Sequence, residues 1–113
     1  MSDCIFCKII KGDIPSQKVY EDELVYAFRD IAPAAPVHVL IVPKEHLCCL
    51  NAAKPEHQAL LGHILLTAQK LAEDLGVKDD GYRIINNCGE NAGQTVFHLH
   101  FHLLAGDTFS RLV

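Results

Sequence analysis

The chain has 113 residues, of which 50% are hydrophobic and 21% charged, with a formal net charge of −4 and an isoelectric point near 5.9. This length suits one domain over residues 1–113 and is too short for separate substrate and cofactor domains. The acidic balance argues against a nucleic-acid polymer as a ligand, because such binding depends on many Lys and Arg side chains that neutralise phosphates.

The apolar and cysteine patterns limit where the protein works. The longest apolar run, residues 37–43, is far shorter than a membrane span and contains His38, so no membrane association is expected. Five cysteines is an odd number, and Cys48 and Cys49 are adjacent, which does not suit a disulfide framework. Reduced thiols in the cytoplasm are the expectation.

The N-terminal part predicts a short helix and a hairpin. Residues 4–11 carry apolar side chains at helical spacing and stop at Gly12, which favours a helix that ends there. Residues 18–21 and 24–29 are rich in β-branched and aromatic side chains and flank a short acidic turn. They are therefore predicted to pair as two strands.

The middle of the chain predicts a central strand and one long helix. Residues 37–42 are apolar except for His38, which is typical of a strand covered on both faces. From residue 55 to residue 75 the apolar side chains form a helical stripe, with Pro55 suited to a first turn and Gly76 to the stop. His57 and His63 lie on or near this helix, match no motif and are expected on its surface.

The C-terminal part predicts two further strands. Residues 81–86 read as one strand, and a polar loop with glycines, residues 87–93, returns the chain into residues 95–104. The final residues, 105–113, give little signal. The predicted fold is α+β, with an antiparallel sheet of about five strands, one long helix and a short N-terminal helix.

Three histidines alternate with large apolar residues at the start of the last predicted strand. His98, His100 and His102 share one face of an extended chain, whereas the residues between them share the other. Alternate residues of a strand lie roughly 7 Å apart, so the outer pair, about 13 Å apart, cannot closely share one phosphate-sized group. The three imidazoles must therefore have different roles.

Imidazole suits phosphorus chemistry near neutral pH. The middle ring, His100, could attack a phosphorus atom and form a phosphoimidazole intermediate that water then cleaves. The leaving group needs a proton, and the developing oxygen charge needs fixed donors. Candidates near in sequence are His102, Gln94, Thr95 and the backbone N–H groups around Gly93.

A metal site is an alternative reading of the same histidines. Two imidazoles of a His-x-His pair could bind a catalytic zinc with an open water position if His38 supplied a third ligand. The Cys4-x-x-Cys7 pair is a modest zinc signal by itself, because it needs two more ligands. A redox role for this pair is less favoured, since no strand precedes it.

These motifs together resemble the histidine triad superfamily. The resemblance rests on residues 98–104, the Asn87 to Thr95 loop, Asp30-Ile31 and the segment from Pro36 to Lys44, and it covers nearly the whole chain. The length of the chain and the order of its motifs are similar to those of the Hint branch. Members of this branch are purine nucleoside phosphoramidases, which hydrolyse the P–N bond of adenosine 5′-monophosphoramidates. The resemblance implies an AMP-like purine nucleotide substrate and a homodimer.

The resemblance also implies a role for each site residue. His100 is expected to be the nucleophile that becomes nucleotidylated, His102 to contact the phosphate and assist the leaving group, and His38 to lie behind His100 and orient it. Asp30 is expected to hold the ribose hydroxyls, and Phe28 and Ile31 either contact the base or belong to the core. The remaining expected nucleotide-binding residues are Asn87, Gly93, Gln94 and Thr95.

Bacterial members with the N-terminal Cys-x-x-Cys are similar in binding a structural zinc. By this resemblance the ligands are Cys4, Cys7, His46 and His98, with Cys48 or Cys49 as alternatives to His46. A site closed by four ligands has no open water position, so this zinc would hold the N-terminus on the sheet and would not perform chemistry.

Two other functions stay open at this point. A dinucleoside polyphosphate hydrolase of the same superfamily would use the same His100 but cleave P–O bonds. A nucleotide-binding interaction module would use the same pocket without physiological turnover.

Overall fold

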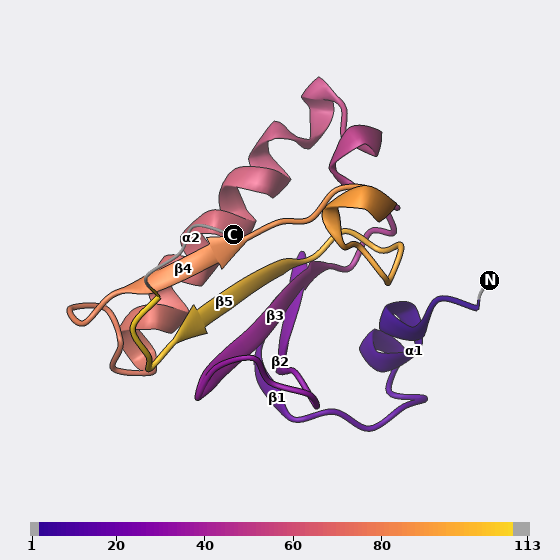
Figure 1. Cartoon of the computed structure of the whole chain (residues 1–113). Coiled ribbons are helices and arrows are strands. Elements are labelled where there is room, and N and C mark those ends of the chain that lie inside the picture. The colour runs from indigo at the N-terminus through magenta and orange to yellow at the C-terminus, as the bar shows by residue number, and fades with distance from the viewer. Residues whose placement is uncertain (1–2, 110–113) are drawn as a thin grey trace.

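An antiparallel sheet of five strands is the framework of the fold. In the computed structural model, which describes residues 3–109, the strands lie in the order β1-β2-β3-β5-β4 (Figure 1). The predicted α+β fold, with a short N-terminal helix and one long helix, is confirmed. The strands are β1 (Lys18–Glu21), β2 (Val25–Arg29), β3 (Val37–Pro43), β4 (Tyr82–Ile85) and β5 (Phe101–Ala105).

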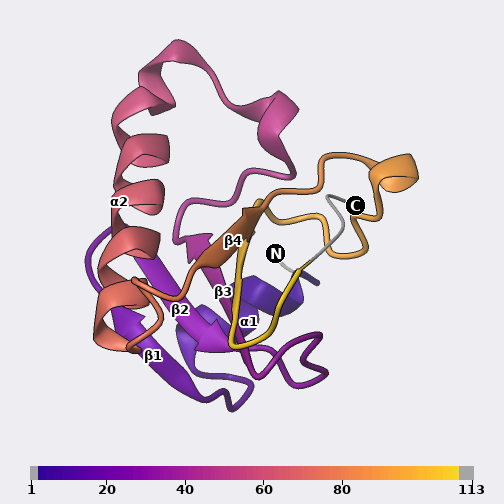
Figure 2. The same cartoon turned by 60° about the vertical axis from the view of Figure 1, so that its left-hand side comes forward.

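Two helices cover opposite faces of this sheet. The short helix α1 (Ile5–Lys11) and the long helix α2 (Gln58–Asp74) lie on its two sides (Figures 1 and 2). Side chains of β2 alternate between them: Val25 packs in the core under α2, whereas Phe28 packs with α1. Because both faces are covered, β3 is buried along nearly its whole length, as its apolar run predicts.

Local capping explains where α1 begins and ends. The sulfur of Cys4 accepts a hydrogen bond from the backbone N–H of Cys7 at 3.3 Å, which satisfies a free donor of the first turn. Gly12 ends the helix with φ of 87°, a left-handed conformation that glycine adopts without steric cost. The cap thus places Cys4 and Cys7 one turn apart at the same end of α1.

The histidines of the long helix are less exposed than expected. His57, in the 3-10 turn Pro55–His57 before α2, is only 7% exposed and bonds Glu45 at 2.9 Å. His63 is half-buried and bonds Asp22 of the β1–β2 turn at 2.7 Å. Both rings therefore tie α2 to neighbouring segments. Among residues 3–109, neither α1 nor α2 has both the length and the continuous apolar character of a membrane-spanning helix.

The last strand is shorter than predicted. Its ladder with β3 runs only to the pair Ile41 and Phe101, so His98 and His100 precede β5 in an extended, bent segment. Here the backbone N–H of Leu99 bonds the carbonyl of Leu47 at 2.6 Å, outside the sheet. Despite this bend, His98 and His100 still lie on the same face of the segment, because the rings of both pack against Phe6 of α1. The other short 3-10 helices are Leu50–Ala52 and Glu90–Ala92.

Candidate active site

His100 lies just before β5, beneath α1. Its ring packs edge-on against Phe6 with ring centroids 5.1 Å apart, and its Nδ1 atom lies 2.7 Å from the main-chain carbonyl of His98. Because a carbonyl oxygen only accepts hydrogen bonds, Nδ1 carries the proton, and the neutral ring has its lone pair on Nε2. Nε2 of His100 has no hydrogen-bond partner among residues 3–109. Every side-chain nitrogen that is fully buried in this part of the chain does have a partner, so Nε2 is not one of the fully buried atoms. Nε2 of His100 therefore remains accessible to solvent.

His102 and His38 form a separate pair beside His100. Nε2 of His38 lies 2.9 Å from Nδ1 of His102. The backbone N–H of Ala34 donates to Nδ1 of His38 at 3.0 Å, so a neutral His38 carries its proton on Nε2 and donates it to His102. His102 in turn must carry its own proton on Nε2. The rings of His100 and His102 have centroids 5.1 Å apart.

Burial keeps both members of this pair neutral. Burial, together with the neighbouring His100 and His38, lowers the pKa of His102 to about 4. Burial also lowers the pKa of His38, although the Asp30 carboxylate, 3.4 Å from its Nε2, opposes the shift. At neutral pH His102 therefore offers an N–H donor beside the ring of His100.

The position of His38 differs from the expectation that it lies behind His100. Its ring contacts His102, and the carbonyl of His98 orients His100 instead. The candidate ligand atoms of Asp30, His38 and His102 lie within 4.8 Å of one another. However, the proton on Nε2 of His38 leaves that atom no lone pair for a metal. The contacts favour a hydrogen-bond relay here over the catalytic zinc that the His-x-His pattern left open.

The polar loop from residue 86 to residue 95 lies against the histidine segment. The side-chain N–H of Asn86 donates to the main-chain carbonyl of His100 at 2.9 Å. Asn87 follows it directly, and Gly93 and Thr95 are exposed at the other end of the loop. Sequence reasoning selected Asn87 and missed Asn86, because no local pattern shows which of two adjacent amides reaches the next strand.

The side chain of Gln94 is used within the loop. It is 3% exposed, its Nε2 donates to the carbonyls of Cys48 at 2.8 Å and Val96 at 3.1 Å, and its Oε1 accepts from the N–H of Gly89 at 2.8 Å. These bonds occupy both ends of the amide. The contacts thus give the side chain a role in holding the loop, in contrast to the expected phosphate-binding role.

An apolar pocket of about 280 Å³ lies next to the histidines. Phe6 contacts the ring of His100 and also lines this pocket, which places the two side by side. Such a cavity can bury a flat aromatic group, and the carboxylate of Asp30 on its wall can accept hydrogen bonds from hydroxyls. The lining residues are Ile5, Phe6, Ile9, Pro15, Ser16, Phe28, Arg29, Asp30, Ile31, Leu40, Thr95 and Val96.

The sequence indicated only part of this pocket. Asp30, Ile31 and Thr95 were expected near a nucleotide, and they line this pocket together with Phe28, which was expected either at the base or in the core. The α1 residues were missed because apolar side chains at helical spacing predict a core-facing stripe in any helix. Ile31 is 98% exposed, whereas Phe28 is 5% exposed and also belongs to the α1 core.

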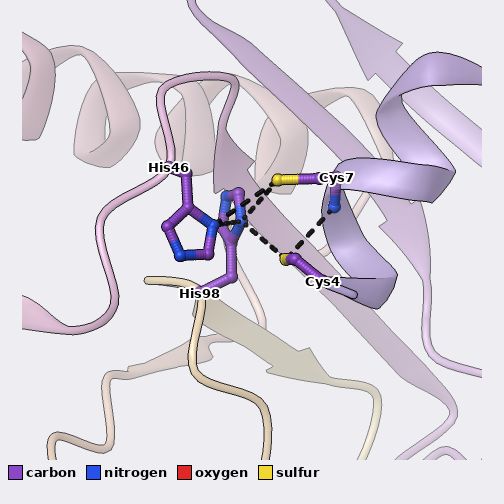
Figure 3. Close-up of side chains that lie close together, drawn as sticks. All are labelled: Cys4, Cys7, His46 and His98. Carbon is purple, nitrogen blue, oxygen red and sulfur yellow. Dashed lines mark hydrogen bonds between the residues drawn. The ribbon is translucent and has the colours of Figure 1, made fainter. Parts of the chain in front are cut away.

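The four expected metal ligands lie together at the other end of the histidine segment. Cys4 and Cys7 from the start of α1 face His46 from the segment after β3 and His98 (Figure 3). Nδ1 of His98 lies 3.3 Å from the sulfur of Cys4, 3.6 Å from that of Cys7 and 3.1 Å from Nδ1 of His46. His46 completes this group, and neither Cys48 nor Cys49 belongs to it.

The geometry of this cluster fits zinc. Ligands of a tetrahedral zinc with two sulfurs and two nitrogens lie about 3.3–3.8 Å from one another, close to the separations observed here. Nε2 of His98 lies 2.8 Å from the carbonyl of Pro43, so Nε2 carries the proton and the lone pair of Nδ1 points to the other ligands. Since all four donors come from the chain, no coordination position is left for water.

Comparisons with known proteins show what the whole chain is similar to. The HIT domain family model matches residues 11–109. An uncharacterized HIT-like protein of Synechocystis is 56% identical over 108 residues, which cover 96% of this chain and 94% of the relative. A purine nucleoside phosphoramidase of Escherichia coli K12 is 48% identical over 104 residues, which cover 92% of this chain and 87% of the relative.

A solved structure shows the same likeness in three dimensions. A HIT family hydrolase from Clostridium thermocellum superposes with a TM-score of 0.96 at 53% identity. The superposition covers 100% of this chain and 99% of that one. The likeness therefore extends over the helices, the sheet and the histidine segment together.

Proposed function

The chain belongs to the HIT domain family, and from this premise we propose that it is a hydrolase of nucleoside 5′-phosphoramidates that works through a nucleotidyl-His100 intermediate. The relatives named as a hydrolase and as a purine nucleoside phosphoramidase support this class of reaction. The observation that carries the proposal is the contact between Nδ1 of His100 and the His98 carbonyl at 2.7 Å, which leaves Nε2 as a nucleophile.

In the first step Nε2 of His100 attacks the phosphorus. A bond forms between Nε2 and phosphorus, the P–N bond to the leaving amine breaks, and the amine nitrogen keeps the electron pair and takes a proton from solvent water. The N–H of His102 donates a hydrogen bond to a phosphoryl oxygen and stabilises its charge. With a pKa near 4, His102 serves at neutral pH as a donor of a hydrogen bond and not as an acid.

In the second step water attacks the phosphorus and releases the nucleotide. The bond from phosphorus to Nε2 of His100 breaks, and its electron pair returns to the ring. The attacking water releases a proton to solvent, which neutralises the hydroxide left when the amine took its proton in the first step. The hydrogen bond from Nδ1–H to the His98 carbonyl is present throughout, and it favours the partial positive charge that the ring carries in the intermediate. His38 acts through His102 as a positioning residue.

The nucleotide would use the apolar pocket and its rim. We assign the purine base to the cavity bounded by Phe6, Phe28 and Ile31, and the ribose hydroxyls to the carboxylate of Asp30. A carboxylate accepts from two hydroxyls but repels phosphate, which suits a position away from the reacting phosphorus. The phosphate would face the exposed loop end with Gly93 and Thr95, with Asn87 nearby.

A structural zinc completes the proposal. Cys4, Cys7, His46 and His98 would bind it and thereby fasten α1, which carries Phe6, to the histidine segment. The ion stabilises the fold when bound, and the chemistry is left to His100 and His102.

We also propose a cytoplasmic homodimer. Within residues 3–109, β4 is an edge strand that pairs only with β5, and Tyr82 on it is 37% exposed. On α2, next to the sheet, Leu65 and Leu66 are 50% and 65% exposed. A second copy placed on this apolar surface would bury all three side chains and pair the edge.

Trapping the intermediate tests the function directly. The zinc-loaded protein is mixed with a radiolabelled adenosine phosphoramidate and quenched in base, and acid-labile label is mapped by peptide. Label on His100, absent from His100→Ala, is the expected result. Turnover without trappable label on His100, or faster cleavage of diadenosine polyphosphates than of the amidate, would contradict the proposal.

A further inference from the structure

Three cysteines lie outside the metal cluster and gather at one junction. Cys48 and Cys49 precede the 3-10 helix Leu50–Ala52, and Cys88 lies in the polar loop. Gln94 joins the two segments: its amide donates to the Cys48 carbonyl at 2.8 Å and accepts from the N–H of Gly89, the neighbour of Cys88, at 2.8 Å. The two segments run side by side in Figure 1.

The thiol of Cys49 is at the centre of this group. Its sulfur lies 3.2 Å from that of Cys48. The pKa of Cys49 is held below its usual range, first by the hydrogen bond from Cys48, and then by the backbone N–H of Asn51 and the thiol of Cys88. The neighbouring Cys48 has its pKa raised by the same hydrogen bond. Of the two thiols in contact, Cys49 is therefore the one whose pKa is lowered.

The surroundings of Cys49 are those of a reactive thiol. It is half-buried and reachable from solvent, its sulfur contacts that of Cys48, and Gln94 ties the loop that carries Cys88 to the same segment. Low-pKa, accessible cysteines beside a resolving cysteine are the ones that hydroperoxides oxidise. The zinc cluster differs, because a bound metal would protect its two thiolates.

We propose that Cys49 is an oxidation site for hydroperoxides and that Cys88 resolves it, so that a reversible disulfide joins the polar loop to the Cys48–Cys49 segment. The Cys49 thiolate attacks the peroxide oxygen, the O–O bond breaks, and a sulfenic acid and hydroxide form. The Cys88 thiol then attacks the sulfenic sulfur and releases water. In sum two thiols lose two electrons and two protons, and one hydrogen peroxide becomes two water molecules.

Cys88, and not Cys48, is the resolving partner. Disulfides span Cα atoms 4.4–6.8 Å apart, whereas adjacent residues have Cα atoms about 3.8 Å apart. A bond between Cys48 and Cys49 would therefore be strained, although their sulfurs are in contact. Cys88 approaches from another segment and is free of this restriction.

The disulfide would act on the nucleotide site through the loop. Cys88 lies two residues after Asn86, which holds the His100 carbonyl, and one residue before Gly89, which Gln94 holds. Drawing Cys88 toward Cys49 moves this loop relative to the nucleophile, and displacements near 1 Å at an active site cost up to about 100-fold in rate. This consequence depends on the proposed phosphoramidase activity, whereas the disulfide itself does not.

The disulfide is tested on the zinc-loaded protein with one equivalent of hydrogen peroxide. Free thiols, bound zinc and non-reduced peptides are measured together. We expect two thiols to be lost, zinc to be retained, and one cross-linked peptide pair that joins Cys49 to Cys88. Cys48→Ser should form the same bridge, whereas Cys88→Ser should stop at a sulfenic acid on Cys49 that a dimedone probe labels.

Turnover of the amidate provides the functional readout. Oxidation should lower kcat/KM by about tenfold or more, a thiol reductant should restore it, and Cys88→Ser should be insensitive to the same treatment. Absence of turnover in the reduced protein would reject the proposed function and leave the disulfide measurement intact. A bridge between Cys48 and Cys49, oxidation that begins with zinc loss, or unchanged chemistry in Cys88→Ser would overturn the proposal.

Discussion

The histidine segment presents a different ring nitrogen at each of its two ends: Nδ1 of His98 at the end with the four candidate metal ligands, here called the metal end, and Nε2 of His100 at the end with the proposed nucleophile, here called the reactive end. At one end the Nε2–H of His98 is tied to the carbonyl of Pro43, which leaves Nδ1 free to face Cys4 and Cys7. At the other end the Nδ1–H of His100 is tied to the carbonyl of His98, which leaves Nε2 free beside His102. The two rings therefore carry opposite tautomers, and a main-chain carbonyl selects each one. In each ring the hydrogen bond to a main-chain carbonyl thus determines which nitrogen keeps a free lone pair.

The largest expected effect is at the reactive end. His100→Ala should lower kcat on a nucleoside phosphoramidate by at least about 10³-fold, because the nucleophile is lost, while AMP binding persists. Stopped-flow turnover and AMP titration on the same preparation measure the two. As a control, His63→Ala, which loses only the Asp22 contact, should stay within about twofold. Near-normal turnover in His100→Ala would remove the nucleophile assignment.

Loss of zinc from the metal end should lower the thermal stability of the protein and leave its turnover nearly unchanged. Cys7→Ser, or chelation of zinc, should lower the melting temperature by more than about 10 °C, since a structural metal contributes directly to folding free energy. Below the transition kcat should fall by no more than a few fold. Cys48→Ser, an exposed thiol outside the cluster, should change neither quantity. An immediate loss of kcat on chelation with the fold intact would favour a catalytic metal.

The pKa of His102 predicts an acid-sensitive fold. This pKa is about 4 in the folded chain and about 6.5 in the unfolded chain, so the unfolded state binds more protons between these values. The free energy of unfolding should therefore fall as pH decreases from about 6.5 to 4, by at most about 1.4 kcal/mol per pH unit for this group. Urea unfolding of the wild type and of His102→Gln, at several pH values, measures the difference. Equal slopes in both proteins would refute it.

The smallest expected effect on kcat comes from a substitution of Asn86, whose side chain contacts the main chain of His100 at the reactive end. Asn86→Ala removes the hydrogen bond to the His100 carbonyl, and one such bond contributes about 1 kcal/mol, so kcat should fall about fivefold. Zinc retention should be unchanged. Asn91→Ala, an exposed asparagine of the same loop, is the matched control and should not affect kcat. A drop in zinc retention would show that the two ends are not independent.

The sequence was sufficient for most of the fold, and it predicted that the three histidines have different roles. Periodicity predicted both helices and the five strands, because each buries one or two continuous apolar faces. The spacing of a strand predicted that the outer pair, His98 and His102, could not closely share one phosphate-sized group. The strand was nevertheless predicted too long, because the contacts that end the ladder at Phe101 come from distant segments.

The rest of the site depends on contacts that no local pattern contains. The partner of His38, the internal bonds of Gln94 and the pocket wall from α1 all join segments far apart in the chain. Tautomers depend on which carbonyl or N–H lies within hydrogen-bond distance, as with Ala34 and His38. Residue type alone therefore indicates that a histidine is functional, but not which nitrogen it presents.

The tautomers of His98 and His100 are the most direct test of this account. Long-range ¹H–¹⁵N correlation spectra of the zinc-loaded, ¹⁵N-labelled protein at neutral pH distinguish protonated, unprotonated and metal-bound ring nitrogens. The account predicts that His100 is protonated at Nδ1 with a free Nε2, and that His98 is protonated at Nε2 with a metal-bound Nδ1. A His100 ring protonated at Nε2, or bound to metal, would contradict it.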